Sequence, residues 1–167
     1  MYKTTLSLAL SSILSLSLLM TGCGNDEIEE QVEDTQVKQE ETIDKERIET
    51  MTNVTCDLMY YESISNKMAD AIETVETRED CISAYATVDA TLEELRSYAN
   101  CPETAELKGY LANMLVSTME GLDYMYQNNE YSAEKALNDV QTYASKYQQE
   151  YKRLTNEYYS DNTEAYN

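Results

Sequence analysis

The chain has 167 residues and a net charge of −20, with 12 Lys and Arg against 32 Asp and Glu, and it contains no His, Trp or Phe. So negative a charge argues against nucleic acid as a partner, because the binding of phosphates depends on Lys and Arg. The missing histidine removes the usual general base and the imidazole ligands of metal sites. Four glycines and one proline offer little turn chemistry for a many-stranded sheet or a phosphate-binding loop. The composition therefore favours one helical domain.

Residues 1–22 have the pattern of a secretory signal peptide. Lys3 is the only charged residue before Asp26, and it is followed by an apolar stretch of about 15 residues that is interrupted by serines. This stretch is shorter than the roughly 20 apolar residues that a bilayer-spanning helix needs. It ends in Leu19, Met20, Thr21, Gly22 and Cys23.

The sequence from Leu19 to Cys23 resembles the lipobox of bacterial lipoprotein precursors. In that family a small residue precedes a cysteine whose thiol receives a diacylglyceryl group, and the signal peptide is cut before this cysteine. The resemblance implies that Cys23 carries the lipid and holds the mature chain on the extracytoplasmic face of the cell membrane. Met20 departs from the leucine that the family prefers at its position. A plain secreted chain and an uncleaved anchor are the alternatives, and sensitivity of the processing to globomycin separates them.

Residues 23–44 are expected to form an acidic linker. From Gly24 to Asp44 the chain has nine acidic residues, one lysine and four isolated aliphatic residues. Such a segment buries too little apolar surface to offset the entropy lost on ordering it. We expect a disordered or weakly helical stalk, and we interpret it as a solvated spacer rather than a specific acidic binding motif.

Residues 45–167 are expected to form the folded domain. Four rows of residues at steps of three and four, mostly apolar, indicate four amphipathic helices. The rows run from Met51 to Val75, from Cys81 to Ala99, from Leu107 to Met125 and from Ala133 to Tyr158. Short connections make neighbouring helices antiparallel, so the sequence predicts an all-α, up-down-up-down four-helix bundle.

Two of the three expected turns have clear signals. Asn100-Cys101-Pro102 ends one helix and begins the next, because the residue before a proline avoids helical geometry and proline suits the first helical position. Asn128 and Asn129 tolerate a left-handed backbone, and Ser132 is a candidate cap for the last helix. The turn near residues 77–80 has no Gly or Pro. Without it the first two helices would fuse into a rod of about 55 residues, which would leave its apolar row uncovered, so we expect separate helices.

Three cysteines remain if Cys23 carries the lipid. Cys56 and Cys101 lie at the same level of adjacent predicted helices, so a disulfide between them is one hypothesis, although Cys56 lies on the far side of its helix from the apolar row. The alternative is three separate thiols, with Cys81 packed as a small apolar residue. A zinc site is not expected, because the chain has no close-spaced cysteine pair and no histidine. We expect neither a metal nor a cofactor.

The 15 tyrosines are the whole aromatic content of the chain. Several, including Tyr85, lie in the apolar rows, where the ring can pack while the hydroxyl reaches the edge of the bundle. Tyr124, Tyr126 and Tyr131, near the turn between the last two helices, are the candidate contact patch, because tyrosine is favoured at protein interfaces. In an up-down bundle this turn lies at the same end as the first hairpin turn. The patch would therefore point away from the stalk and the membrane.

No motif in the chain indicates an enzyme. Carboxylate pairs such as Asp70 with Glu73 have helical spacing, but such pairs are ordinarily the solvated faces of surface helices. We expect no catalytic residue and predict a membrane-anchored lipoprotein that acts as a helical protein-interaction module, such as an accessory, exclusion or immunity factor. The alternative is an acidic lipoprotein that binds cations, cationic peptides or cell-wall material through the field of its domain. From residue 45 onward this domain has 10 Lys and Arg against 23 Asp and Glu, a net charge of −13.

Overall fold

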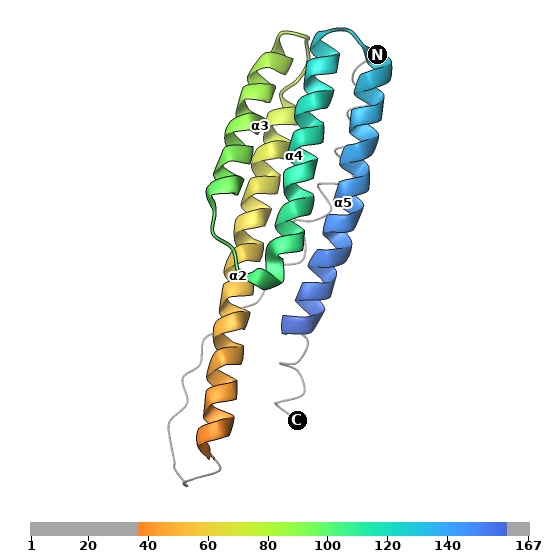
Figure 1. Cartoon of the computed structure of the whole chain (residues 1–167). Coiled ribbons are helices and arrows are strands. Elements are labelled where there is room, and N and C mark those ends of the chain that lie inside the picture. The colour runs from red at the N-terminus through yellow and green to blue at the C-terminus, as the bar shows by residue number, and fades with distance from the viewer. Residues whose placement is uncertain (1–36, 160–167) are drawn as a thin grey trace.

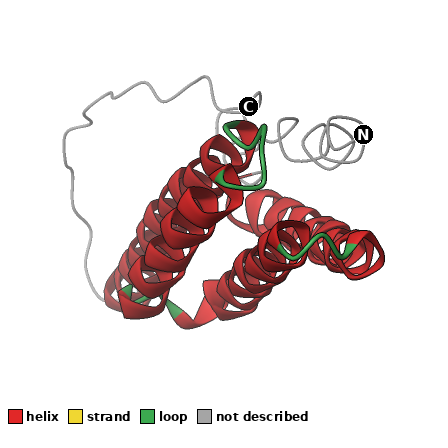
Figure 2. Ribbon diagram, turned by 90° about the horizontal axis from the view of Figure 1, so that it is seen from above, coloured by secondary structure: helices red, strands yellow, loops and turns green. Residues whose placement is uncertain are grey.

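The computed structural model describes residues 37–159, and the side chains of residues 45–158. The described chain forms α2 (Val37–Glu73), α3 (Asp80–Ser97), the short 3₁₀ helix η2 (Pro102–Thr104), α4 (Ala105–Tyr126) and α5 (Glu130–Tyr159). The four long helices run alternately up and down (Figure 1). Within these residues only helices and loops are present (Figure 2). The predicted all-α four-helix bundle is confirmed.

The expected signal peptide, the lipobox from Leu19 to Cys23 and most of the acidic linker lie outside the described residues. The last part of the expected linker, residues 37–44, belongs to α2, so this helix begins earlier than the periodicity predicts. At 1.5 Å per residue, the 37 residues of α2 span about 55 Å, whereas the 18 residues of α3 span about 27 Å. The start of α2 therefore extends beyond the other helices (Figure 1). None of the described helices is long and apolar enough to cross a membrane.

The four apolar rows meet in one core between the helices. Its largest fully buried side chains include Tyr61 and Ile64 of α2, Leu95 of α3, Leu111 of α4 and Tyr147 of α5. Complete burial of an aliphatic side chain contributes about 1.5–3 kcal/mol, so these rows supply most of the stability of the bundle. Ser65 of α2, which falls on the helical spacing of the apolar row, is also buried.

Small residues bring α4 and α5 close together. A Cβ atom placed on Gly121 of α4 would lie 3.7 Å from the Cβ of Ala136 on α5. Ala133 and Ala144 continue the small buried face of α5. Elsewhere in the core, the hydroxyls of Ser65 on α2 and Tyr147 on α5 are buried without a hydrogen bond of ordinary length and angle.

The turn between α2 and α3 is closed by side chains rather than by glycine or proline. The Thr77 backbone N–H and hydroxyl each donate to Asp80 Oδ2 at 2.8 Å, and the Asp80 N–H points back at Thr77 Oγ1 at 3.4 Å. This reciprocal pair is a capping box, and it holds the pKa of Asp80 below its ordinary value. The first two helices are therefore separate, as expected, and the alternative of one long rod is wrong.

The other two connections agree with their sequence signals, with one correction. Pro102 begins η2 after the extended residue Cys101. Asn128 has a φ of 60°, the left-handed conformation expected between α4 and α5. The cap of α5 is Asn129, not Ser132: the Ser132 N–H donates to Asn129 Oδ1 at 3.2 Å, because the helix begins three residues earlier than expected.

The α2–α3 and α4–α5 turns lie at the same end of the bundle. Arg78 Nε in the first turn donates to the Tyr126 carbonyl at the end of α4 at 2.9 Å, and the guanidinium carbon lies 5.7 Å from the centre of the Tyr126 ring. The start of α2 and the α3–α4 connection lie at the opposite end (Figure 1).

Candidate functional site

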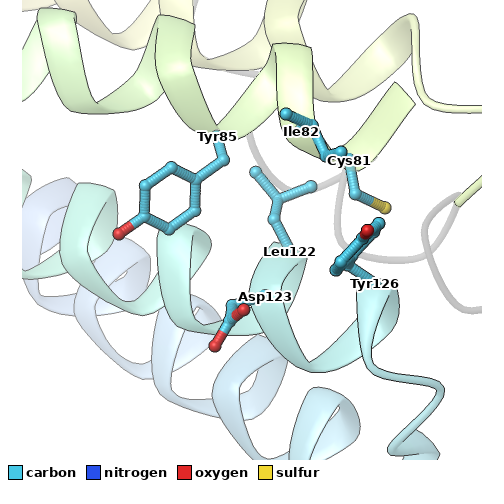
Figure 3. A pocket seen from close by; sticks show the side chains of 6 residues that line it. All are labelled: Cys81, Ile82, Tyr85, Leu122, Asp123 and Tyr126. Atoms are coloured by element: carbon cyan, nitrogen blue, oxygen red, sulfur yellow. The ribbon is translucent and has the colours of Figure 1, made fainter. Parts of the chain in front are cut away.

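An apolar groove of about 200 Å³ lies between the start of α3 and the end of α4. It is lined by Cys81, Ile82 and Tyr85 of α3 and by Leu122, Asp123 and Tyr126 of α4 (Figure 3). Cys81 and Leu122 form its floor, with exposed fractions of 1% and 3%. Its rim is exposed and also largely apolar, because Ile82, Tyr85 and Tyr126 have exposed fractions of 55%, 39% and 43%.

The rim on α3 results from how this helix is turned in the bundle. Cys81 and Val88 are buried, and between them the helix buries Ala84 instead of Tyr85. Ala84 and Tyr85 both lie three or four residues from Cys81 and Val88, and the smaller alanine faces the core. The prediction that Tyr85 lies in the core row is therefore wrong: Tyr85 lies with Ile82, three residues earlier, on the edge of the groove.

The rim on α4 is positioned by the turn at the end of the bundle. Leu122 and Tyr126 are four residues apart and share one face of α4. Arg78 holds the last turn of α4 through the Tyr126 carbonyl and lies over the Tyr126 ring. Asp123 Oδ2 accepts a hydrogen bond from Gln127 Nε2 at 2.7 Å, which orders the one acidic side chain that lines the groove.

The thiol of Cys81 serves as an apolar part of the floor. Its Sγ lies 3.7 Å from the Thr77 carbonyl oxygen. Burial, assisted by the nearby charge of Asp80, raises the pKa of Cys81 above its ordinary value, so the thiol stays neutral at physiological pH. A neutral, buried thiol is suited to packing rather than to nucleophilic chemistry.

The groove contains one of the three tyrosines of the predicted contact patch. Tyr126 lines it, whereas Tyr124 is half-buried and packed against the core. Tyr131, at the start of α5, has an exposed fraction of 81% and is not among the lining residues. The structure instead brings Tyr126 together with Ile82 and Tyr85, two residues outside the predicted patch. The position of Ile82 outside the apolar row of its helix is the signal that the sequence contains.

The hypothesised Cys56–Cys101 disulfide is not formed. Cys56 is exposed on α2, and Cys101 is half-buried with its Sγ 3.6 Å from Thr104 Oγ1, so both are free thiols in different surroundings. Cys56 lies off the apolar row of α2 on the exposed face of the helix, whereas Cys101 is half-buried in the α3–α4 connection.

A buried carboxylate lies at the other end of the bundle, where α2 meets the α3–α4 connection. Asp57 accepts hydrogen bonds from the Tyr98 hydroxyl at 2.7 Å, from the Cys101 N–H at 2.9 Å and from the Thr104 hydroxyl. Burial raises the pKa of Asp57, but the hydrogen bonds outweigh it and hold this pKa below the ordinary value.

The surroundings of Asp57 indicate a structural role. The Tyr98 ring stacks on Tyr60 with their centres 3.8 Å apart, and Lys108 Nζ donates to the Tyr98 carbonyl at 2.5 Å. Every hydrogen bond described for the carboxylate goes to the connection itself. Asp57 therefore fastens this connection to α2, and we assign it no catalytic part.

No group of three or more His, Cys, Asp or Glu side chains among the described residues is placed to hold a metal ion. Comparison of the chain with family models, with curated proteins and with solved structures finds no match. The features that bear on function are the groove, the charge around it and the N-terminal sequence.

Proposed function

We propose that the protein is a lipid-anchored, extracytoplasmic interaction module that binds a protein partner in the groove between α3 and α4. The observation that carries this proposal is the exposed apolar rim of Ile82, Tyr85 and Tyr126 around a buried floor. Exposed apolar surface gathered in one place and edged by polar residues is typical of interaction sites, whereas scattered apolar residues are ordinary.

The position of the groove suits a tethered protein. The groove lies at the end of the bundle where α2 finishes, and α2 begins on the order of 55 Å away at the other end. A lipid on Cys23, which precedes α2 in the chain, would hold the start of this helix towards the membrane. The groove would then point outward, where a partner can reach it.

The anchor itself is proposed from the lipobox-like sequence from Leu19 to Cys23. Each buried methylene contributes about 0.8 kcal/mol to membrane binding, so several acyl chains on one cysteine form a lasting tether. Labelled palmitate should be incorporated into the wild-type chain and not into the Cys23→Ser variant, and globomycin should leave the wild-type precursor uncut. Incorporation that persists in Cys23→Ser, or normal cutting of the wild type in globomycin, would contradict the anchor.

The interaction is tested by purifying the tagged full chain from detergent-solubilised membranes of the cells that make it. We expect a stoichiometric partner with the wild type and its loss with Ile82→Ser or Tyr126→Ser. Met59→Ser is the matched control, because Met59 is 61% exposed on α2 and does not line the groove. Recovery of the chain alone would contradict the proposal and favour the acidic ligand binder. A partner retained by the groove variants would place the interface elsewhere.

A further inference from the structure

The helices that form the groove carry acidic residues around it and almost no basic ones. The chain has no Lys or Arg from residue 79 to 95 on α3, or from 109 to 134 around the end of α4. Exposed carboxylates lie one helical turn from lining residues: Glu79 before Ile82, Asp89 after Tyr85 and Glu120 before Asp123, which is itself in the lining. The groove is therefore apolar in its interior and negative at its edges.

The basic group that lies nearest in the sequence is already engaged. Arg78 donates to the Tyr126 carbonyl and lies over the Tyr126 ring, so its guanidinium is held against the end of α4. The Asp80 carboxylate accepts the hydrogen bonds of the capping box from Thr77, is half-buried and does not line the groove. Its charge adds to the negative field, but we do not place Asp80 among the groups that touch a partner.

Charge and size narrow the class of occupant. A second copy of this chain would bring together two domains that each have a net charge of −13 from residue 45 onward, so the field opposes self-association. The groove volume of about 200 Å³ is below the roughly 300–1,000 Å³ of small-molecule pockets. Apolar side chains that enter from a larger, positively charged partner fit both observations.

We infer that the partner presents a basic amphipathic helix to the groove. This inference rests on the proposed function and names the chemistry of its partner. Apolar side chains on one face of the helix pack on Cys81 and Leu122 between the rims of α3 and α4, in the manner of a helix laid in an apolar groove. Lys and Arg side chains that flank this face lie against Glu79, Asp89 and Asp123. The apolar contacts supply affinity, and the charges supply orientation and selection of the partner.

The test uses the mature full chain in detergent and three fluorescent peptides of about 18 residues, a length that supports a helix on binding. The first has a leucine face and lysines elsewhere, the second has glutamates in place of the lysines, and the third has the first composition scrambled so that no apolar face forms. Fluorescence anisotropy measures the affinities. We expect the Leu/Lys peptide to bind at least about tenfold more tightly than either of the others.

Variants then locate the binding on the protein. Ile82→Ser should weaken the Leu/Lys peptide about tenfold, because an apolar contact is lost. Asp123→Asn should weaken it about two- to fivefold at low salt and less at high salt, as for an exposed ion pair. The matched controls are Met59→Ser on α2 and Asp139→Asn on α5, both at exposed positions outside the lining, and we expect no change. Far-UV circular dichroism checks that each variant is folded.

The outcomes separate this inference from the proposed function. If the Leu/Glu peptide binds equally well and Ile82→Ser weakens it, the charge argument is overturned while the groove remains an interaction site. Equal binding of the scrambled peptide, or equal weakening by Met59→Ser, would mean general attraction to an acidic protein and would overturn the inference. If no peptide binds, the inference is overturned, and purification from membranes still tests the proposed function independently.

Discussion

Replacing Asp57 with alanine removes the shared acceptor of three hydrogen bonds between α2 and the α3–α4 connection. The three donors are not affected equally. The Thr104 hydroxyl keeps the Cys101 carbonyl as a partner at 3.2 Å, and the half-buried Tyr98 hydroxyl can turn to water. The Cys101 N–H loses the one acceptor described for it.

The size of the loss follows from this difference. A hydrogen bond to a charged group contributes about 1.5–3 kcal/mol, and a buried group left unsatisfied costs about 1–3 kcal/mol. With one N–H left unsatisfied and two bonds weakened, we expect Asp57→Ala to lower the free energy of unfolding by about 3 kcal/mol. Asp57→Asn should cost less, about 1–2 kcal/mol. The amide oxygen of the asparagine can still accept from the Cys101 N–H, and its NH₂ can donate to the Tyr98 oxygen. Both hydrogen bonds are weaker than those of the aspartate, because the amide carries no charge.

The assay is urea unfolding at neutral pH followed by far-UV circular dichroism. Asp70→Ala is the matched control, because Asp70 is an exposed carboxylate on the same helix, and it should change the free energy of unfolding by less than about 0.5 kcal/mol. Equal stability of Asp57→Ala and Asp70→Ala would show that the hydrogen bonds of Asp57 do not stabilise the fold. An equal loss of unfolding free energy for Asp57→Asn and Asp57→Ala would contradict the expectation that asparagine keeps hydrogen bonds to Cys101 and Tyr98.

Three further predictions concern pH, a buried hydroxyl and the glycines of α4. The pKa of Asp57 is lower in the folded chain than its ordinary 3.8, so the stabilisation by its carboxylate is complete above pH 3.8 and is lost as the pH falls through the lowered value. In urea unfolding, the stability advantage of wild type over Asp57→Asn should therefore shrink from about pH 5 to pH 3. A constant advantage would contradict the lowered pKa. The Tyr147 hydroxyl is buried without an ordinary hydrogen bond, so Tyr147→Phe should leave the free energy of unfolding unchanged or raise it by up to about 1 kcal/mol, whereas a clear loss would mean that the hydroxyl has a partner. Gly109→Ala should raise the free energy of unfolding by about 0.5–1 kcal/mol, because a Cβ there meets nothing within 4 Å. Gly121→Leu should lower it by about 1–3 kcal/mol, because the larger side chain forces α4 away from Ala136. Thermal melting temperatures that shift in the same direction for both variants would contradict the close approach of α4 to α5 at Gly121.

The helices could be predicted because the residues that are buried in the core recur in the sequence at helical spacing. Rows at steps of three and four place apolar side chains on one face of a helix, and these faces meet in the core of the bundle. The α2–α3 turn was expected without a local signal, yet one is present. Thr77 and Asp80 have the spacing of a capping box, and their reciprocal hydrogen bonds begin α3.

The groove could not be predicted, because it depends on rotation and register between helices. Ala84 and Tyr85 satisfy the helical spacing equally well, and packing against neighbouring helices decides that the alanine is buried. Ile82 meets Tyr126 only through the alignment of α3 with α4, which the contact of Arg78 with Tyr126 helps to fix.

The cluster around Asp57 was missed for a similar reason. In the sequence this residue is one carboxylate among many. Its donors lie 41 to 47 residues further along the chain, in Tyr98, Cys101 and Thr104. Only the folded connection brings these donors to one buried oxygen pair, so residue spacing within α2 carries no sign of it.

Photo-crosslinking from the groove shows directly whether a protein occupies it. A photoreactive amino acid replaces Tyr126 in the lipid-anchored full chain, and intact membranes of the cells that make it are irradiated, with the same amino acid at Met59 as the control. We predict one discrete protein adduct from position 126 that is absent from position 59 and disappears when Ile82→Ser is added. No adduct from position 126, or the same adducts from both positions, would contradict the claim that the groove binds a protein partner.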